Sequence, residues 1–472
     1  MLHNQGLTHL SKWTPAYLLA VLGALVSSCW VHQQRQPLRP NIVLIYADDL
    51  GWNDLGCYGN GAHQTPAIDA LAAEGLRFRA AYSAAALCAP ARASLLTGRD
   101  VLAHGIHCVN TPQQAHPDAR RFDPPANTRQ LSPELPTIAE ALRDAGYRTG
   151  CYGKWHLGHE RKEVSQWHPL RRGFEEAVQT RSPSGKRRYF YPDYTTIPDV
   201  PVEVGTHMSD FVSEQAVAFL ERDDDRPFFL YLPYFSVHGP REAKPASLAA
   251  ARAAASSPDS DPVYAAMCAD LDAAVGVVLG ALDRLGLAED TMVVFTSDNG
   301  ANSRYDNAPY REGKGWLYEG GIRIPMLVRW PGVVARGGVT SHPVSQLDLM
   351  PTLAQAAAAQ LPSELDGVSL CGLLAGAPQA GALGARELRW HAPDYAQFRQ
   401  GRFQRAPLSA VRRGRYKLVY DHERDHSSLY DLVSDPGESI DRAAEQPHVV
   451  DDLQRSLESW LAEAPALQPR PR

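Results

Sequence analysis

Residues 41–52 read NIVLIYADDLGW, and this stretch decides the fold of the chain. Residues 41–46 form a largely β-branched apolar run without alternation, which is typical of a strand buried on both faces of a sheet. Asp48 and Asp49 follow almost at once. The stretch therefore predicts a central strand that ends at a pair of carboxylates.

The pattern of an apolar strand followed by polar side chains recurs along the chain. Apolar runs at residues 147–152, 227–232 and 292–296 alternate with segments of helical periodicity. This order predicts an α/β fold, with a large, mostly parallel sheet sandwiched by helices. Ligand sites in such sheets lie beyond the carboxyl ends of the strands. One rim is therefore expected to gather the polar residues after the strands, namely Asp48, Asp49, Lys154, His156, His238, Asp298 and Asn299.

The last hundred residues have a different character. Residues 411–420 alternate as a half-buried strand does, and residues 449–461 have the spacing of an amphipathic helix. A chain of 472 residues exceeds the usual size of one hydrophobic core. We therefore expect a large α/β domain over residues 41–367 and a smaller α+β subdomain with an antiparallel sheet over residues 368–472.

The N-terminus predicts export. After Lys12, residues 16–26 are apolar, too few to span a bilayer but suited to the core of a secretion signal. The small residues before Cys29 also resemble a bacterial lipobox, whose cysteine is lipidated. We expect a signal peptide or lipoprotein signal over residues 1–29 and a linker over residues 30–40. The protein is then expected in the periplasm or at the cell surface. If Cys29 is lipidated, it anchors the protein to the membrane.

Composition narrows the classes of partner. The residues are 44% hydrophobic and 21% charged, which indicates a globular chain, and the net charge of −6 argues against nucleic acid. Basic clusters at 171–172 and 186–188 are either solvated faces or the border of a polyanion site. With Cys29 and Cys88 set aside, five of the seven cysteines remain and cannot all pair, so a full disulfide framework is not expected.

Residues 87–99, LCAPARASLLTGR, predict a short helix with chemistry at its start. Pro90 suits a first helical turn and Gly98 a helix end. Cys88 is then expected at the positive end of the helix, with Arg92 one turn along on the same face. Such a setting attracts anions and lowers a thiol pKa. The stretch by itself therefore indicates either an anion-facing reactive cysteine or a buried cysteine before an ordinary capped helix.

The carboxylates of the rim call for a cation. Asp48, Asp49 and Asp298 would repel one another if they were crowded together without compensation. An all-oxygen set completed by Asn299 selects a hard divalent ion, Ca²⁺ or Mg²⁺, over zinc.

The motif Cys-x-Pro-x-Arg followed by ASLLTGR resembles the signature of type I, formylglycine-dependent sulfatases. The resemblance, arylsulfatase-like and within the alkaline phosphatase superfamily, extends from residue 41 to about residue 432. It implies that a maturation enzyme oxidises Cys88 to formylglycine, whose hydrate is the nucleophile. It also assigns one Ca²⁺ to Asp48, Asp49, Asp298, Asn299 and the modified Cys88. Two-zinc phosphatases of the superfamily typically carry histidine at the place of Asn299 and serine or threonine at that of Cys88.

The same resemblance implies a role for each remaining residue of the rim. Lys154 and Lys314 hold the sulfate, and Arg92 supports the hydrate. His238 is the general acid that protonates the leaving alcohol. His156 deprotonates the second hydroxyl of the hydrate, which expels sulfate and regenerates the aldehyde.

The function expected from these residues is that of a sulfuric ester hydrolase. Export and the basic loops favour a sulfated carbohydrate over a small sulfate ester, although the sequence does not identify the ester. One alternative is a formylglycine-dependent phosphonate monoester or phosphodiester hydrolase, and another is an unmatured sulfated-glycan-binding protein. Substrate subsites are expected in the loops at 101–131, 160–205 and 391–402, with the individual candidates His107, His116, Arg120, Arg121 and Tyr194.

Overall fold

The structure is a computed structural model that describes residues 39–109, 116–158, 164–181, 189–255, 260–302, 305–377, 382–400 and 402–472. The predicted signal, Cys29, most of the linker and the basic cluster at 186–188 lie outside these residues. Arg39–Arg472 forms one compact unit. Cys57, Cys88, Cys151, Cys268 and Cys371 are free cysteines.

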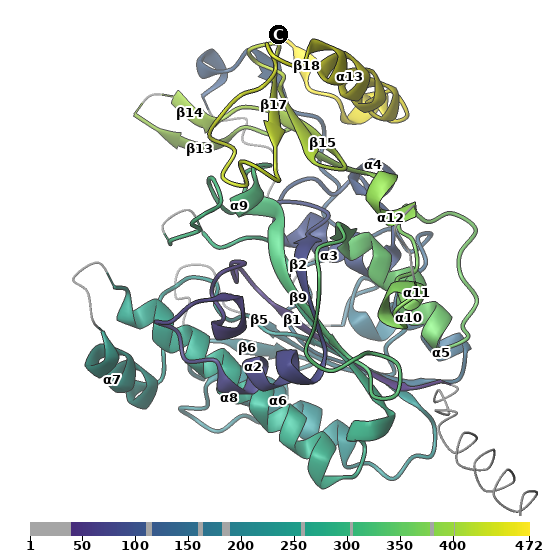
Figure 1. The fold of residues 1–472 in the computed structure, drawn as a ribbon. Helices are drawn as coiled ribbons and strands as arrows, with labels where there is room; N and C mark the ends of the chain where they lie inside the picture. Colours follow the sequence, from purple (N-terminus) through teal and green to yellow (C-terminus); the bar gives the residue numbers. More distant parts are fainter. Residues whose placement is uncertain are drawn as a thin grey trace, which may run out of the picture. The chain divides into compact units, whose positions relative to one another are not determined.

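The larger part of the fold is a ten-stranded sheet with β1 at its centre (Figure 1). β1 pairs in parallel with both β7 and β8, and β4 lies parallel to β7 and β5. β9 runs antiparallel between β8 and β2, and β6 antiparallel to β5, so the sheet is mixed but mostly parallel as predicted. Its strands are β1 (Asn41–Ala47), β2 (Leu76–Tyr82), β4 (Arg148–Gly153), β5 (Glu176–Arg181), β6 (Thr195–Ile197), β7 (Phe228–Pro233), β8 (Thr291–Ser297), β9 (Arg323–Arg329), β10 (Gly338–Thr340) and β11 (Val344–Ser345).

β1 is buried on both faces, as its sequence predicts. Val43 and Ile45 face one hydrophobic core, formed with α2, α6 and α8, whereas Ile42 and Leu44 face a second core, formed with α3, α5 and α10. Figure 1 shows these helices on opposite sides of the sheet. The helices around the sheet are α2 (Pro66–Glu74), α3 (Cys88–Thr97), α4 (Val101–His104), α5 (Ile138–Asp144), α6 (Met208–Leu220), α7 (Pro245–Ala254), α8 (Pro262–Arg284), α9 (Glu319–Ile322), α10 (Leu349–Ala356), α11 (Cys371–Leu374) and α12 (Ala382–Ala385).

α8 is the one helix among the described residues that is long and apolar enough to cross a membrane. Of its apolar window, 67% is buried inside the protein, where it contributes to the core beside α2 and α6. Its apolar character is therefore that of a core helix.

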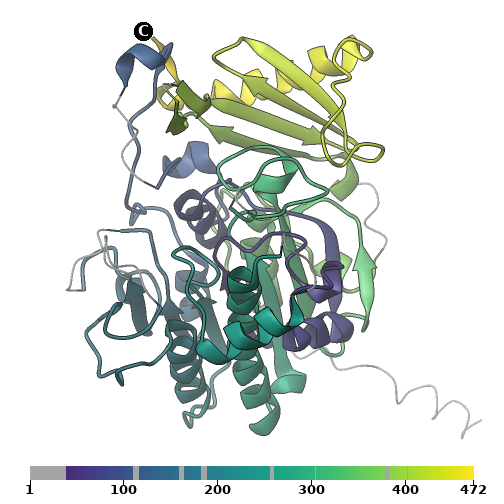
Figure 2. The same cartoon turned by 90° about the vertical axis from the view of Figure 1, so that its left-hand side faces the viewer.

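A four-stranded antiparallel sheet with the order β12-β15-β16-β17 forms the C-terminal part, as expected. One of its faces packs on α13 and the other on the larger domain through Tyr82 and Ile322 (Figure 2). Leu370, Leu374 and Leu383 still pack in the core of the larger sheet, so the antiparallel sheet begins well after residue 368. Its elements are β12 (Glu387–Ala392), β15 (Leu408–Arg413), β16 (Tyr416–Asp421), β17 (His426–Asp431) and α13 (Pro447–Leu461), with the hairpin β13 (Ala396–Arg399) and β14 (Arg402–Arg405) beside them.

The segment read from sequence as one long loop, residues 101–132, contains regular structure. It begins with α4, which Asp100 caps by accepting from the Leu102 N–H at 2.9 Å. Farther along, β3 (Phe122–Asp123) pairs with β18 (Arg470–Pro471) near the C-terminus. Composition alone suggested an irregular loop because these elements are short and depend on a distant part of the chain.

Candidate active site

The predicted rim residues meet at the carboxyl ends of four strands. Asp48 and Asp49 follow β1, Lys154 and His156 follow β4, His238 follows β7, and Asp298 follows β8. Backbone hydrogen bonds extend the parallel ladder past the strands, because the Asp48 N–H donates to the Ser236 carbonyl at 2.9 Å and the Asp298 N–H to the Ala47 carbonyl at 3.1 Å. The sheet itself therefore holds these side chains in register.

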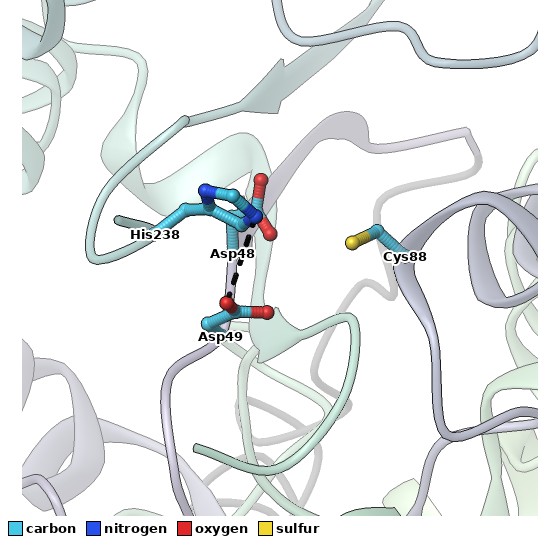
Figure 3. Close-up of side chains that lie close together, drawn as sticks. All are labelled: Asp48, Asp49, Cys88 and His238. Atoms are coloured by element: carbon cyan, nitrogen blue, oxygen red, sulfur yellow. Dashed lines mark ion pairs between the residues drawn. The ribbon is translucent and has the colours of Figure 1, made fainter. Parts of the chain in front are cut away.

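Cys88 is the first residue of α3, and Gly98 ends this helix with φ of 65°, both as predicted. The Cys88 sulfur points from the start of the helix toward Asp48 and His238 (Figure 3). One ligand atom from each of Cys88, Asp48, Asp49 and His238 lies within 4.8 Å of the others. Residues from three separate parts of the chain thus converge on one point.

The prediction of a lowered Cys88 pKa is wrong for the thiol. Burial raises the pKa of Cys88 to about 11, although Lys154 and Lys314 act in the opposite direction. The side chain is 1% exposed, so loss of water around the thiolate outweighs the positive helix end and the two ammonium groups. The unmodified thiol is therefore a poor nucleophile in this position.

Positive side chains surround the carboxylates. The Arg92 Nη2 donates to Asp298 Oδ2 at 2.8 Å, and its Nη1 donates to the Lys154 carbonyl at 3.0 Å. Lys154 Nζ donates to Asp48 Oδ2, and Lys314 Nζ lies 2.5 Å from Asp49 Oδ1. Burial alone would raise the pKa of Asp48, but Lys154 and the other cations hold that pKa well below its usual range.

The carboxylates and the amide fit a hard divalent cation. Asp48 Oδ1 and Asn299 Oδ1 are buried, and neither atom has a hydrogen-bond partner among the described residues. Asn299 Nδ2 donates to Asp49 Oδ1 at 2.8 Å, and Asp298 Oδ1 accepts the Asp49 N–H at 3.1 Å, so all four side chains adjoin. Burial and the charge of Asp48 raise the pKa of Asp298, and a cation beside these groups would relieve that repulsion. Buried oxygen atoms with unused lone pairs are the donor set that Ca²⁺ prefers.

The two histidines lie in different electrostatic surroundings. His238 Nε2 faces Asp49 Oδ2 at 3.7 Å (Figure 3). The other ring nitrogen of His238, Nδ1, lies 2.6 Å from the Gly239 carbonyl. Burial lowers the pKa of His238, which the Asp49 charge opposes. Burial, with Lys154 adding to it, lowers the pKa of His156 well below its usual value, so His156 is a neutral imidazole. His156 Nδ1 is buried and unpaired among the described residues, and its φ is 64°.

Three polar residues that the sequence reasoning missed hold the loop after β8. Ser83 Oγ donates to the Asp298 carbonyl at 2.5 Å, and Gln346 Nε2 donates to the Ser297 carbonyl at 2.5 Å. Ser297 Oγ in turn accepts the Leu50 N–H at 3.1 Å. Their polar groups meet only in the folded chain, so the spacing of these residues carried no signal.

Several predicted subsite residues serve the fold instead. Tyr194 is fully buried in a hydrophobic core, so its assignment to a subsite is wrong. His107 is buried with Nδ1 at 2.6 Å from Asp394 Oδ2, and Arg121 Nη1 donates to the Glu423 carbonyl at 2.6 Å. Arg172, from the basic cluster at 171–172, is buried with Nη2 donating to the Leu135 carbonyl at 2.6 Å, so it is not part of a solvated basic face.

Comparisons with known proteins agree with this geometry. The sulfatase family model matches residues 40–359, and a model of the C-terminal region of N-sulphoglucosamine sulphohydrolase matches residues 312–464. Human arylsulfatase A is 36% identical over 451 residues, which cover 85% of this chain and 82% of that protein. Mouse N-acetylgalactosamine-6-sulfatase is 34% identical over 384 residues, covering 75% and 68% respectively.

Solved structures share the fold. The crystal structure of Ps i-CgsB in complex with k-i-k-neocarrahexaose has a TM-score of 0.75 and 29% identity, covering 89% of this chain and 92% of that one. The structure of BT4656 in complex with its substrate D-Glucosamine-2-N, 6-O-disulfate has a TM-score of 0.70 at 21% identity, covering 91% and 99%. By its family model and its relatives, the chain belongs to the sulfatase family: it is a type I sulfatase of the alkaline phosphatase superfamily, an enzyme that hydrolyses sulfate esters.

Proposed function

We propose that this sulfatase releases inorganic sulfate from a sulfated carbohydrate, using formylglycine made from Cys88 and one bound Ca²⁺. The observation that carries the proposal is the convergence of Cys88 with Asp48, Asp49 and His238 within 4.8 Å, beside the buried Lys154 and the partly buried Lys314. Formylglycine supplies, as its hydrate, the nucleophilic oxygen that the unmodified, protonated thiol lacks.

The lysines bind the sulfate group. Sulfuryl transfer spreads negative charge over the nonbridging oxygens, and fixed cations in a buried site stabilise that charge. Burial would lower the pKa of both Lys154 and Lys314, but Asp48 and Asp49 respectively raise these values above normal. Both ammonium groups therefore stay protonated. Arg92 orients Lys154 indirectly, through its bond to the Lys154 carbonyl, and also donates to Asp298.

The histidines divide the proton transfers. With Nδ1–H of His238 donating to the Gly239 carbonyl, Nε2 is the atom that holds a proton for the leaving oxygen. The Asp49 charge beside Nε2 favours uptake of that proton, and the lowering of the His238 pKa by burial favours its transfer to the leaving oxygen once it is bound. His156 is held neutral and accepts a proton at its unpaired Nδ1.

Asp48, Asp49, Asp298 and Asn299 would hold the Ca²⁺, together with the modified Cys88. A divalent cation there supplies charge that neutralises the carboxylates and the sulfate oxygens. The donor oxygens argue for a hard ion, and we propose Ca²⁺ over Mg²⁺ because carboxylate and amide oxygens of a protein rarely meet the strict octahedral geometry of Mg²⁺.

Carbohydrate as the substrate class is supported by the relatives and by the predicted export. N-acetylgalactosamine-6-sulfatase is named for a sulfated sugar, as is the model that matches the C-terminal region. Rat steryl-sulfatase is also a relative, 33% identical over 421 residues. Steryl and aryl sulfates are therefore the substrates with which sulfated carbohydrates are compared in the test.

The test is sulfate release by enzyme co-produced with a maturation enzyme. Defined sulfated mono- and disaccharides, an aryl sulfate, a steryl sulfate and an aryl phosphonate monoester are compared by kcat/KM. We expect the highest kcat/KM on a sulfated saccharide. Higher turnover of the phosphonate would contradict the proposal in favour of a phosphonate hydrolase, and equal glycan binding by wild type and Cys88→Ala without sulfate release would indicate a binding protein.

We also propose that the chain is exported to the periplasm or cell surface, with Cys29 as a lipid attachment site. The apolar residues 16–26 and the small residues before Cys29 support this. Cell fractionation of wild type and Cys29→Ala tests it: the variant is expected to leave the membrane fraction. Wild-type protein found only in the cytosol would contradict export.

A further inference from the structure

Three buried charges join the C-terminal sheet to the rim of the larger sheet. Lys417 on β16 places Nζ 3.0 Å from Glu319 Oε1 and 2.9 Å from Glu438 Oε1. Each of these three side chains is 0% exposed. Glu319 is the first residue of α9, whereas Lys417 and Glu438 belong to the C-terminal part. We call these residues the Glu319–Lys417–Glu438 cluster.

Hydrogen bonds hold both the side chain and the backbone of Glu319. Glu319 Oε2 accepts from the Tyr82 hydroxyl at 2.7 Å and from Arg323 Nη1 at 3.1 Å. Glu438 Oε2 accepts the Glu319 backbone N–H at 2.6 Å. Burial would raise the pKa of Glu319, but Lys417 and Arg323 hold that pKa below normal, so the carboxylate is charged. Loss of the Lys417 charge would leave buried carboxylates undercompensated.

α9 in turn packs directly on the segment that carries Lys314. The Gly320 N–H donates to the Arg311 carbonyl at 2.9 Å. A Cβ added at Gly320 would lie 2.4 Å from the Glu312 carbonyl oxygen, and one at Gly321 would lie 2.5 Å from the Gly313 carbonyl oxygen. The backbone of α9 thus lies too close to residues 312–313 for any side chain larger than glycine, so a shift of α9 toward this segment would displace it.

α9 also touches the loop of the proposed metal ligands. The Gly300 N–H donates to the Gly321 carbonyl at 3.0 Å. A Cβ on Gly300 would lie 1.8 Å from the Gly320 carbonyl oxygen. Gly300 directly follows Asn299, and the Lys314 N–H donates to the Ala301 carbonyl at 2.8 Å. α9 thus contacts two loops of the active site, the one that carries Lys314 and the one that follows Asn299.

We propose that Lys417 is a positioning residue for sulfate hydrolysis, acting from the C-terminal sheet through α9 on Lys314. Lys417 fixes Glu319, Glu319 fixes α9, and α9 sets where the Lys314 ammonium group lies beside Asp49. The C-terminal sheet is therefore part of the apparatus that binds the anion. This inference rests on the proposed role of Lys314 in holding sulfate.

The test uses the full-length enzyme with Lys417→Met, which keeps the length of the side chain without its charge, and Lys417→Arg, which keeps the charge. Inorganic sulfate binding is measured by calorimetry, and kcat and KM with an aryl sulfate. We expect Lys417→Met to weaken sulfate binding and raise KM about tenfold, a smaller loss than the roughly hundredfold cost that a displacement of about 1 Å can have. Lys417→Arg is expected to recover most of the loss. If Lys417→Met fails to fold, Lys417→Met/Glu438→Gln replaces it, since that pair removes one charge of each sign.

A double-mutant cycle shows whether Lys417 acts through Lys314. In the Lys314→Ala background, Lys417→Met is expected to change sulfate binding less than it does in the wild type, because coupled residues are non-additive. Asp272→Ala is the matched control, since this buried carboxylate accepts the Ala67 and Ile68 N–H groups at the start of α2, away from α9. The control is expected to lower Tm and leave sulfate binding unchanged.

Two results would overturn the inference. One is a Lys417→Met enzyme with lowered Tm but wild-type KM and sulfate affinity, and the other is an additive cycle. Because calorimetry needs no turnover, loss of sulfate affinity in Lys417→Met would support the inference even if the wild type hydrolysed none of the sulfate esters. That outcome would count against the proposed function alone.

Discussion

Lys314 Nζ lies 2.5 Å from Asp49 Oδ1, although the two residues come from opposite halves of the catalytic domain. The contact places an anion-binding group directly beside a proposed metal ligand. A sulfate held by Lys314 therefore lies next to the carboxylates that would hold the cation, and binding of the anion and of the metal are expected to depend on one another.

Removing the Lys314 ammonium group should lower kcat/KM strongly and the thermal stability of the protein only slightly. Lys314→Ala is expected to lower kcat/KM for an aryl sulfate about a hundredfold, the scale reported for loss of one preorganised charge stabiliser. Lys314→Arg keeps the charge and should lose less. Steady-state kinetics together with thermal melting checks this, and a variant with wild-type kcat/KM would exclude Lys314 from sulfate binding.

Chelation should remove activity reversibly. Treatment with a calcium chelator is expected to abolish sulfate release, and added Ca²⁺ to restore it. A cation that binds only the folded state at a hundred times its Kd stabilises it by about 2.7 kcal/mol, so Tm should rise with Ca²⁺. Asp298→Asn should melt independently of Ca²⁺. Full activity after exhaustive chelation would contradict a required metal.

The proton held on His238 Nε2 should matter most for poor leaving groups. His238→Gln is expected to slow alkyl or sugar sulfates by about 10² or more, the usual range for loss of a general acid. Esters of acidic phenols need little protonation and should be much less affected. A plot of log kcat against the pKa of the leaving alcohol, for wild type and variant, checks this; parallel lines would reject His238 as the acid.

Buried histidines of the C-terminal part should make stability depend on pH. Burial lowers the pKa of His391 to about 3, with Nε2 at 3.0 Å from the Leu467 carbonyl and Nδ1 at 2.7 Å from Ser409 Oγ. The unfolded chain binds this proton near the usual pKa of 6.5, whereas the folded chain stays neutral down to about 3. Stability is therefore unaffected above pH 6.5 and falls as the pH decreases through that window.

His391→Gln should flatten this dependence. The slope of unfolding free energy against pH near pH 5 is expected to decrease by about 1.4 kcal/mol per pH unit, the value for one linked proton. Denaturant titrations at several pH values measure it. An equal slope in wild type and His391→Gln would contradict a neutral buried His391.

The sequence predicted the rim because a buried strand can be recognised from its local sequence alone. A buried parallel strand such as residues 41–46 has an unbroken apolar run, and its carboxyl end is marked by the first polar residues, Asp48 and Asp49. Parallel pairing then brings such ends together without further information. The same logic located Asp298 and His238, whose neighbours continue the ladders beside β1.

Features that depend on packing between distant parts of the chain could not be predicted from the sequence. The direction of the Cys88 pKa was wrong because helix geometry can be inferred locally, whereas complete burial of the thiol cannot. Tyr194 was placed in a subsite because loops of that composition are often functional, yet it packs in the core. Glu319, Lys417 and Glu438 carried no signal in the sequence, because charged side chains are rarely buried unless paired and only the folded chain pairs these three.

The most direct test of the account is the mass of the tryptic peptide spanning residues 80–92, measured on the same preparation whose sulfate release is assayed. The account predicts the mass of an aldehyde at position 88 in protein that releases sulfate, and no release by Cys88→Ala. A preparation that hydrolyses sulfate esters while residue 88 remains entirely a cysteine thiol would contradict it.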